Sequence, residues 1–426
     1  MDTIVAQATA PGRAGVSVIR ISGPGAKPAL VRLAGRVPEA RRATLMPLHG
    51  DSGLLDTALV LVFDKDASFT GEDVVELQTH GSIAVTRALL TALTAFDGLR
   101  LAEPGEFTRR ALENDRLDLS QVEGLADLIE AETEAQRRLA QATFSGALAK
   151  KVEAWRAQLI RAAALLEAMI DFADEEVPED TTFEVLSLVD DLTTAFESEA
   201  GGVAAAERIR EGFEVAIIGA PNAGKSTLLN RLAGRDAAIT SEVAGTTRDV
   251  IEVRMDIVGL PVTLLDTAGL RDTEDSVEAI GVERAKARAA AADLRIFLGA
   301  PIGIAPQPGD ILAHPKADQS GAPEGLLGVS GLTGTGVDSL LARISAELSG
   351  RLPAQTTATH ARHRAALEAA SDALRAARIE VEAGPERAEF AAEELRTALR
   401  RVEGLTGRIG VEDLLGEIFS SFCIGK

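Results

Sequence analysis

Hydrophobic and polar residues follow three different patterns along the chain. Residues 1 to about 115 mix short apolar runs with helical stretches, separated by glycine and proline. The runs include Val16–Ile21, Ala58–Phe63 and Asp73–Leu77, whose length and composition predict strands. This mixture predicts an α+β domain at the N-terminal end.

A helical pattern follows. Apolar residues recur at helical spacing from Ser120 to Phe172, and Ser120 with Glu123 resembles a helix capping box. An acidic, proline-marked stretch, Asp171–Asp180, interrupts the helical pattern, which then continues to about Ala206.

The pattern changes again in the second half of the chain. From Phe213 to about Ser349 strands alternate with helices, which indicates a parallel α/β sheet. Helix returns in Arg362–Ala383 and Arg387–Val402, with a Gly384–Pro385 break between them.

These patterns predict a multidomain fold of the α/β and α classes. We expect an α+β domain at 1–116, the first part of a helical domain at 117–210, an inserted α/β domain at 211–350, and the second part of the helical domain at 351–426. The alternative is two separate helical domains, and the sequence alone leaves both open.

Composition narrows the function classes. The 426 residues suggest two to four domains. The net charge of −21 argues against broad non-specific nucleic-acid binding, which needs a basic surface. With no tyrosine and one tryptophan, stacking platforms for single strands are scarce. A nucleic-acid partner would need a local basic patch or an accessory subunit.

The same composition indicates a cytoplasmic protein. The single cysteine, Cys423, excludes an internal disulfide framework and suits a reducing compartment. Met1–Ile4 shows no secretory signal, and the longest apolar runs are too short to predict a transmembrane helix.

A phosphate-binding loop stands at Gly219–Thr227, directly after the apolar run Val215–Ile218. Its glycines let backbone N–H groups point inward, and with the next helix N-terminus they form an anion nest. Lys225 would reach the β and γ phosphates, and the Ser226 hydroxyl would bind Mg²⁺. The predicted ligand is a nucleoside triphosphate with Mg²⁺.

Two further segments follow in the order expected of a GTPase. Gly245–Asp249 carries threonines that can bind Mg²⁺ and sense the γ-phosphate, although a plain polar loop is the alternative. The strand pair Val250–Ile257 and Val262–Leu265, turned at Gly259–Pro261, leads into Asp266–Gly269. Together the three motifs resemble those of translation-factor-like GTPases rather than ATPases.

The base-binding motif departs from the usual pattern. GTPases of this kind carry Asn-Lys-x-Asp, and this chain has Pro315, Lys316 and Asp318 at the matching positions. Lys316 can stack on the base and Asp318 can accept two guanine N–H groups, but Pro315 offers neither amide nor backbone N–H. Ser330 begins the last base-edge loop. The connection Pro301–Gly309 is short and proline-rich, so a helix is expected to be missing there.

The group that positions the attacking water is also unusual. Residue 270 is leucine, where a Ras-like enzyme has glutamine. Glu278 is a candidate, and its alternative is a solvated surface acid. Asn222, with the segment Ser241–Thr246 above it, could form an oxygen cage for a monovalent cation that supplies positive charge.

Further motifs span almost the whole chain and resemble the MnmE (TrmE) family of tRNA-modification GTPases. The matching segments are Asp2–Thr9, Phe69–Asp73, Pro104–Thr108, Asn114–Leu119 and Ile418–Lys426. The terminal Cys-Ile-Gly-Lys is highly specific.

The resemblance implies a K⁺-dependent GTPase with a Ras-like P-loop domain and an N-terminal folate-binding domain. It implies a homodimer formed through the N-terminal and GTPase domains, and a heterotetramer with an FAD-containing partner of the MnmG (GidA) type. Such proteins modify wobble uridine (U34) of tRNA at C5 to the carboxymethylaminomethyl or aminomethyl form. The one-carbon unit comes from a tetrahydrofolate, in the 5-formyl or 5,10-methylene form. No membrane partner is implied.

The resemblance also assigns residues. Folate would be bound by Arg20, Glu76, Arg116 and Lys426, where Arg116 replaces a lysine found in many members. Mg²⁺ would be held by Ser226 and Thr247, and K⁺ by Asn222, Ser241, Val243 and Thr246. Catalysis would use Glu278, Thr247 and Lys225. The GTP-binding set would be Asn222, Ala223, Gly224, Lys225, Ser226, Thr227, Ser241, Val243, Thr246, Thr247, Asp266, Thr267, Ala268, Gly269, Lys316, Asp318 and Ser330.

Cys423 lies beside the implied folate-binding tail, where a role in the modification is a hypothesis and an inert buried thiol is the alternative. Two other functions stay open. One is a GTP-controlled switch or assembly factor without modification chemistry. The other is a folate-binding protein with a degenerate nucleotide domain.

Overall fold

A computed structural model describes the chain in two compact units, Met1–Ala126 with Glu403–Lys426 and Asp127–Val402. No helix in the described part of the chain is long and apolar enough to cross a membrane. The described residues are 2–51, 53–171, 179–235, 252–266, 287–301, 304–351, 356–407, 419, 422 and 425.

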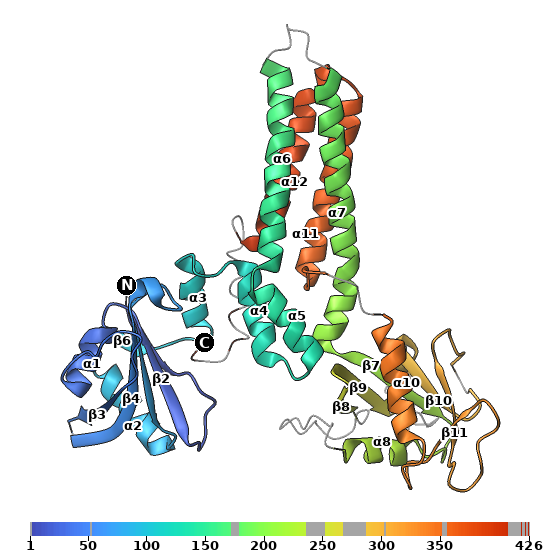
Figure 1. Cartoon of the computed structure of the whole chain (residues 1–426), viewed down its shortest axis with the longest axis horizontal. Coiled ribbons are helices and arrows are strands. Elements are labelled where there is room, and N and C mark those ends of the chain that lie inside the picture. The colour runs from blue at the N-terminus through green and yellow to red at the C-terminus, as the bar shows by residue number, and fades with distance from the viewer. Residues whose placement is uncertain are drawn as a thin grey trace, which may run out of the picture. The chain divides into compact units, whose positions relative to one another are not determined.

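The first unit is built on a six-stranded sheet in the order β3-β4-β5-β2-β1-β6 (Figure 1). Neighbouring strands are antiparallel, except that β1 and β6 are parallel. The predicted strands at 16–21, 58–63 and 73–77 are confirmed in β2, β4 and β5, except that Asp73 lies just before β5. The strands are β1 (Thr3–Gln7), β2 (Val16–Ser22), β3 (Thr44–Gly50), β4 (Gly53–Phe63), β5 (Val74–His80) and β6 (Leu99–Leu101).

The two faces of this sheet differ because side chains alternate along each strand. Ile19 and Ile21 point to the face covered by α1 (Ala26–Ala34) and α2 (Ile83–Thr94), and both are fully buried there. Arg20, between them, lies on the opposite face. Phe107 of α3 (Glu106–Glu113) packs on that face against β1. Two 3₁₀ turns complete the unit, Lys65–Ala67 and Gly404–Thr406.

The helix α4 (Leu119–Glu130) begins one residue earlier than its predicted cap. Asp118 accepts the N–H of Gln121 at 3.0 Å, and the Gln121 side chain accepts the N–H of Asp118 at 3.1 Å. This reciprocal pair is the capping box. The predicted box of Ser120 and Glu123 is wrong, because both residues lie inside the helix and are buried.

The helical stretch predicted as one run from 120 to 172 consists of three helices. After α4 come α5 (Glu134–Phe144) and α6 (Ala147–Asp171). Thr133 and Gln136 form a capping box that starts α5. Gly146, with a φ of 79°, turns the chain between α5 and α6. Hydrophobic periodicity continues through both breaks, so it conceals them.

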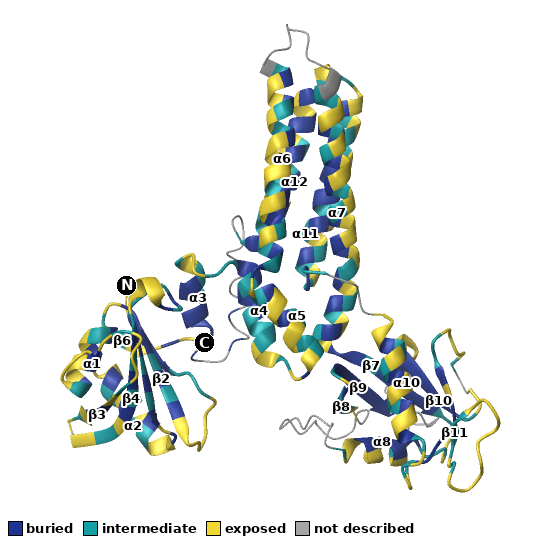
Figure 2. Ribbon diagram, viewed as in Figure 1, coloured by how far each residue is buried: buried dark blue, intermediate teal, exposed yellow. Residues whose placement is uncertain are grey.

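Four long helices of the second unit pack side by side in a bundle (Figure 1). They are α6, α7 (Glu179–Glu211), α11 (Ala361–Glu382) and α12 (Ala388–Glu403), with the 3₁₀ turn Pro385–Arg387 at the predicted Gly384–Pro385 break. Their inward stripes are buried and their outward faces exposed (Figure 2). Trp155 packs edge-on against Phe196, with ring centroids 5.1 Å apart. Helices that precede the α/β segment in the chain and helices that follow it therefore pack in one bundle.

A buried carboxylate joins the two helical segments. Glu199 of α7 is 5% exposed and pairs with Lys151 at 2.5 Å. It also accepts the N–H groups of Thr357 and Ala358, at 2.5 and 2.8 Å. Burial opposes the charge, but these hydrogen bonds outweigh it and lower the pKa of Glu199. Glu199 thereby fixes the chain where it returns to the bundle.

The α/β part of the second unit has a six-stranded sheet in the order β12-β11-β10-β7-β9-β8. All neighbours are parallel except β8 and β9. The helices α8 (Lys225–Ala233) and α10 (Val337–Ser349) pack on one face. The strands are β7 (Phe213–Gly219), β8 (Glu252–Ile257), β9 (Leu260–Asp266), β10 (Leu294–Leu298), β11 (Ile311–Pro315) and β12 (Leu327–Val329).

The connections of this sheet confirm one expectation and correct another. The described residues 304–310 contain no helix, as the proline-rich sequence predicts. The predicted β8–β9 turn at Gly259–Pro261 is confirmed at Gly259 and wrong at Leu260 and Pro261. Val258 and Gly259 make the turn with φ of 54° and 85°, and Leu260 and Pro261 already belong to β9. Positive φ at both central positions is the geometry of a type I′ hairpin.

The hairpin turn contacts the helical part of the same unit. The carbonyl of Gly259 accepts the N–H of Ala135, at the start of α5, at 3.0 Å. The Gln136 side chain donates to the carbonyl of Arg210, near the end of α7, at 2.9 Å. The start of β9 therefore lies against the start of α5.

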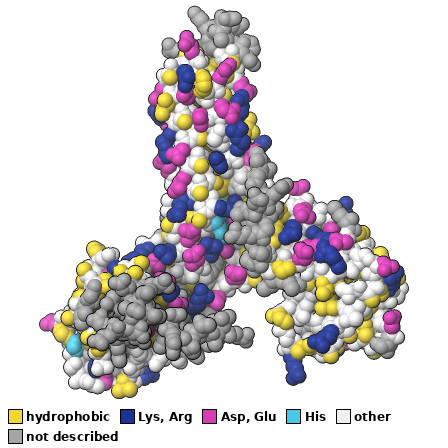
Figure 3. Space-filling view, turned by 180° about the vertical axis from the view of Figure 1, so that it is seen from behind, with side chains coloured by type: hydrophobic (Ala, Val, Ile, Leu, Met, Phe, Trp, Pro, Cys, Tyr) yellow, Lys and Arg dark blue, Asp and Glu magenta, His cyan; other side chains and the backbone are white. Residues whose placement is uncertain are grey.

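Charged side chains of both signs are interspersed over the bundle on the face seen in Figure 3. Many are paired, for example Arg375 with Glu197 at 2.5 Å and Arg396 with Glu167 at 3.0 Å. Such exposed pairs contribute little to stability. The view shows no broad basic surface on the bundle, in agreement with the acidic net charge.

We expect Glu199→Gln to destabilise the bundle by about 1–3 kcal/mol, because a neutral amide cannot replace the carboxylate opposite Lys151. The folded pKa lies below the ordinary 4.5. The contribution is therefore complete above about pH 4.5 and is lost as pH falls through the folded pKa. Urea unfolding followed by the fluorescence of Trp155, the only tryptophan, measures it at neutral and acid pH.

The matched control is Glu197→Gln, two residues away on the same helix, where an exposed pair with Arg375 is lost. Its cost should stay below about 1 kcal/mol. Equal effects of the two substitutions at neutral pH would contradict the role of the buried carboxylate.

Candidate functional site: a phosphate-binding loop and the open face of the N-terminal sheet

The phosphate-binding loop lies between β7 and α8, at the carboxyl edge of the parallel sheet. Gly219 admits no side chain, since a Cβ there would lie 2.7 Å from the carbonyl oxygen of Leu298. Asn222 and Gly224 have φ of 62° and 92°. These left-handed residues turn the backbone so that N–H groups can converge, as an anion nest requires.

Charged groups flank the loop on both sides. Lys225 is 8% exposed, and its ammonium donates to the carbonyls of Gly219 and Ala220 at 2.8 and 3.1 Å. Asp266 ends β9, is 3% exposed and stands next to Ile217 of β7 in the sheet register. Ser226 is half-buried in the first turn of α8. One cation, one carboxylate and one hydroxyl are thus gathered around the loop.

Many of the predicted nucleotide-site residues lie outside the described residues. Of the predicted K⁺ ligands, only Asn222 is described. Of the catalytic set, only Lys225 is described. The residues outside are Ser241, Val243, Thr246, Thr247, Thr267, Ala268, Gly269 and Glu278.

A cavity of about 200 Å³ adjoins the loop, and three loops contribute its walls. The phosphate-binding loop and α8 contribute Ala223, Gly224, Thr227 and Leu228; the β11 loop contributes Pro315, Lys316, Asp318 and Gln319; and the β12 loop contributes Ser330, Gly331 and Leu332. The structure therefore brings Lys316, Asp318 and Ser330 together beside the phosphate loop. A cavity walled by these residues suits a purine base.

The β11 loop keeps its shape without the usual asparagine. Pro315 is the last residue of β11 and pairs with Val329 in the register. Lys316 has a φ of 53°, and its carbonyl accepts the N–H of Gln319 at 2.9 Å. Backbone hydrogen bonds thus hold the turn that carries Lys316 and Asp318.

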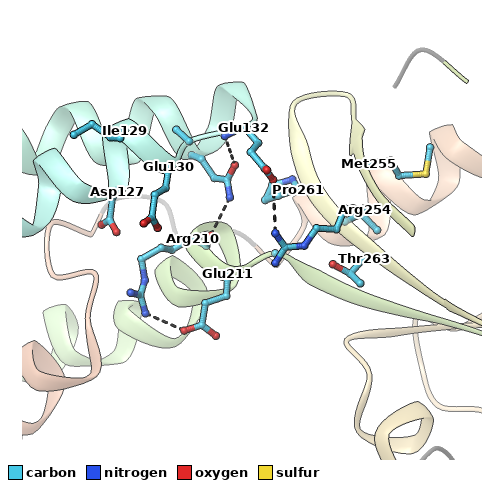
Figure 4. Close-up of a pocket in the computed structure, with 14 residues that line it drawn as sticks. Asp127, Ile129, Glu130, Glu132, Arg210, Glu211, Arg254, Met255, Pro261 and Thr263 are labelled. Carbon is cyan, nitrogen blue, oxygen red and sulfur yellow. Dashed lines mark hydrogen bonds and ion pairs between the residues drawn. The ribbon is translucent and has the colours of Figure 1, made fainter. Parts of the chain in front are cut away.

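A larger cavity, of about 610 Å³, lies between the α4–α5 connection, the end of α7 and the β8–β9 pair (Figure 4). Its two arginines are paired, Arg254 with Glu132 at 4.0 Å and Arg210 with Glu211 at 2.9 Å. Four carboxylates line it and would repel a phosphate: Asp127, Glu130, Glu132 and Glu211. The smaller cavity is therefore the better nucleotide site.

A second candidate site lies on the open face of the N-terminal sheet. Arg20 of β2 and Glu76 of β5 are direct neighbours in the register, and Nε of Arg20 lies 2.9 Å from Oε1 of Glu76. Both side chains are about one-fifth exposed. The Arg20 guanidinium lies 5.7 Å from the ring centroid of Phe107 and donates to the carbonyl of Gly425 at 3.4 Å.

Of the other predicted folate residues, only Arg116 is among the described residues. Arg116 is exposed and lies beside Gly71, and among the described residues no hydrogen bond or ion pair joins it to Arg20 or Glu76. Lys426 and Cys423 lie outside the described residues. Gly425, next to Lys426, packs on β1, where a Cβ at this position would lie 2.2 Å from the carbonyl oxygen of Gln7.

The C-terminal tail is anchored to the same unit by aromatic contacts. Phe419 is fully buried, with its ring 5.9 Å from that of Phe422. The Arg109 guanidinium lies 5.1 Å from the Phe419 ring. Gly105, with a φ of 68°, allows close approach, since a Cβ there would lie 2.9 Å from Phe419 Cδ1. The motif around Gly105 therefore holds the tail.

A buried charge network supports this arrangement. Arg110 binds Asp2, Glu72 and Glu106, with N–O distances of 2.7, 3.1 and 3.0 Å. Burial opposes the charge of Glu106, but hydrogen bonds from Arg100, the Glu103 N–H and Arg110 outweigh it and lower the pKa of Glu106. The network joins the start of the chain to α3.

Comparison with known proteins gives matches over the whole chain. Residues 3–116 match the family model described as GTP-binding protein TrmE N-terminus, and residues 119–423 match that of the MnmE helical domain. The chain is 60% identical over 430 residues to the tRNA modification GTPase MnmE of Ruegeria pomeroyi and 58% identical to that of Roseobacter denitrificans, with 100% of each chain covered. The chain belongs to the MnmE family.

Membership in the MnmE family makes the chain a GTP hydrolase that acts in tRNA modification. Among solved structures, Aquifex aeolicus Era bound to GDP.AlF4⁻ is 26% identical, covering 38% of this chain and 66% of that chain. Its TM-score of 0.25 is too low to support a structural argument.

Sequence reasoning missed the residues that support the site on the N-terminal sheet of this MnmE family member. The Arg110 network and the Phe107 contact depend on α3 crossing the open face of the sheet. One signal is present in the sequence, because Glu106, Phe107 and Arg110 stand in or beside the family motif Pro104–Thr108.

We expect Gly105→Ala to release the C-terminal tail. The left-handed φ alone costs about 1 kcal/mol, and the contact with Phe419 adds to this because the ring must move. Timed carboxypeptidase digestion, read by mass spectrometry, should remove residues past Phe419 faster than in the wild type.

Gly98→Ala is the matched control. Gly98 also has a positive φ, of 80°, but no neighbouring atom lies within 4 Å of the position that an alanine Cβ would take. The variant should lose similar backbone stability and keep the tail protected. Equal digestion of the two variants would contradict the anchoring role of Gly105.

Proposed function

We propose that this GTPase is K⁺-dependent and, with an FAD-containing partner, modifies tRNA U34 at C5 using a tetrahydrofolate one-carbon unit. The observation that carries the proposal is the Arg20–Glu76 pair beneath the C-terminal tail. A paired arginine and carboxylate that are both partly exposed suit a ligand that carries a carboxylate and hydrogen-bond donors, such as a folate. A simple GTP switch has no need of such a face.

The nucleotide site would carry out GTP hydrolysis. Lys225 would neutralise the β and γ phosphates, and Lys316, Asp318 and Ser330 would frame guanine. The donors fit Mg²⁺, since hydroxyl and carboxylate oxygens are its usual ligands and Ser226 and Asp266 flank the loop. When bound, the metal ion neutralises phosphate charge. In this proposal Thr247 completes the metal site and Glu278 orients the attacking water.

The proposed K⁺ site would consist of Asn222, Ser241, Val243 and Thr246. Asn222 stands in the phosphate-binding loop before α8, with a left-handed φ of 62°, and its side-chain amide oxygen would serve as a cation ligand. A monovalent cation there would supply fixed positive charge beside the phosphates.

The folate proposal includes Arg20, Glu76, Arg116 and Lys426. The planar guanidinium of Arg20 would bind a ligand carboxylate, and the ion pair with Glu76 would fix its orientation. Cys423 would stand near the transferred carbon. The proposed setting is the cytoplasm, with a homodimer, a heterotetramer that includes the FAD-containing subunit, and tRNA. We also propose that the folate-binding domain ends at 116 and that the GTPase domain is inserted into the helical domain between 210 and 350.

We expect hydrolysis to require K⁺. GTP turnover measured in KCl and in NaCl at equal ionic strength should be at least about tenfold faster in KCl, as expected if the cation replaces a charged side chain in the transition state. Asn222→Ala should remove most of the difference. Equal GTP turnover in KCl and NaCl would contradict the proposed K⁺ dependence.

We expect Arg20→Ala to weaken 5-formyltetrahydrofolate binding by about tenfold or more, because a charge-assisted bidentate contact is lost. Calorimetric titration measures the affinity. Arg32→Ala is the control, since Arg32 stacks on Phe96 on the covered face, 4.9 Å from the ring centroid. GTP turnover should not change in either variant. Unchanged folate affinity in Arg20→Ala would favour a GTP switch without modification chemistry.

A further inference from the structure

The loop after β12 forms one wall of the base cavity, and it lies directly against α8. Gly331 has no room for a side chain, because a Cβ there would lie 2.5 Å from the backbone nitrogen of Leu228. Within the loop, the N–H of Ser330 donates to the carbonyl of Thr335 at 2.9 Å, and the N–H of Thr333 donates to the Ser330 hydroxyl at 3.2 Å. The loop is therefore a compact turn pressed on the phosphate-loop helix.

Arg231, on α8, binds this loop through two N–H groups of its guanidinium. Its Nε donates to the carbonyl of Gly331 at 3.0 Å, and its Nη2 donates to the carbonyl of Leu332. A planar guanidinium that holds two successive carbonyls fixes the orientation of both peptide planes.

That orientation determines which N–H groups the loop offers. In a trans peptide the carbonyl and the N–H point in opposite directions. With the Gly331 carbonyl held by Arg231, the N–H of Leu332 points away from the Arg231 guanidinium. Among the described residues this N–H has no hydrogen-bond partner, and Leu332 lines the base cavity. The tether therefore leaves one oriented donor at the wall of the cavity.

We propose that Arg231 is a positioning residue for purine selection, which fixes the Leu332 N–H as the donor for the 6-oxo oxygen of guanine. Adenine carries an amino group at that position and cannot accept this hydrogen bond. The inference rests on the proposed nucleotide site and deepens it. Since Pro315 contributes no amide group to the base cavity, the tethered loop carries more of the discrimination here.

The test compares Arg231→Ala with a neighbouring control. Arg235→Ala removes an arginine one turn further along the chain, whose exposed ion pair reaches Asp338 of α10 rather than the loop carbonyls. Steady-state hydrolysis of GTP and of ATP by the full-length protein gives KM and kcat for each nucleotide. Thermal unfolding without nucleotide checks the fold of each variant.

For Arg231→Ala we expect KM for GTP to rise about tenfold, with kcat and the KM for ATP unchanged, so that the preference for GTP falls about tenfold. Arg231→Lys should be intermediate, since one ammonium can hold only one carbonyl in a comparable geometry. Arg235→Ala should match the wild type. If Arg231→Ala unfolds, Arg231→Lys carries the same comparison.

A GTP preference unchanged in Arg231→Ala, or an equal rise in KM for both nucleotides, would overturn the inference. Asp318→Ala separates this failure from failure of the site itself. If Asp318→Ala loses the GTP preference while Arg231→Ala keeps it, only the role of Arg231 is wrong. If neither variant changes the preference, the base lies elsewhere and the proposed nucleotide site is wrong.

Discussion

The second unit depends on closing a helical bundle around a chain that leaves it and returns. The chain departs at the end of α7 and comes back at Thr356. Glu199 binds the returning segment through two backbone N–H groups and two hydroxyls. A buried carboxylate is costly unless it is fully hydrogen-bonded. Lys151 and the returning backbone satisfy it, so the charge is tolerated only when the chain is correctly closed.

Within the α/β segment, the candidate nucleotide site forms although one connection of the sheet is short. The described residues between β10 and β11 include no helix, yet β7, β9 and β10 still meet at one carboxyl edge. That edge gathers the phosphate loop, Asp266 and the base cavity. The chemistry therefore tolerates a short connection because it depends on strand ends rather than on the connecting helices.

Much of the fold and of the nucleotide site can be predicted from local sequence. The loop at Gly219–Thr227 is recognisable because phosphate binding requires a strand, glycines and a helix in fixed order. Lys316 and Asp318 follow a strand at the expected place. In both cases neighbouring residues in the chain perform one task, so the sequence pattern alone is informative.

The remaining features depend on residues far apart in the chain. Arg231 and Gly331 are 100 residues apart, and Arg20 meets Gly425 only because the tail packs on β1. Even a local feature, the start of α4, is hard to predict because Asp118 and Ser120 are both good caps. The competing Asp118–Gln121 pair forms because its two hydrogen bonds are reciprocal.

The hairpin contact between Gly259 and Ala135 has a thermodynamic consequence. The strand β9 has the helical contact at one end and Asp266 at the other, about 20 Å away. A hydrogen-bonded strand within a sheet moves as one piece. If nucleotide binding shifts β9, it changes the free energy of the Gly259–Ala135 contact. By linkage, a change in that contact then alters the free energy of nucleotide binding by the same amount. A ligand that binds the helices near α5 and changes this contact would then alter the affinity for GTP without contacting the nucleotide.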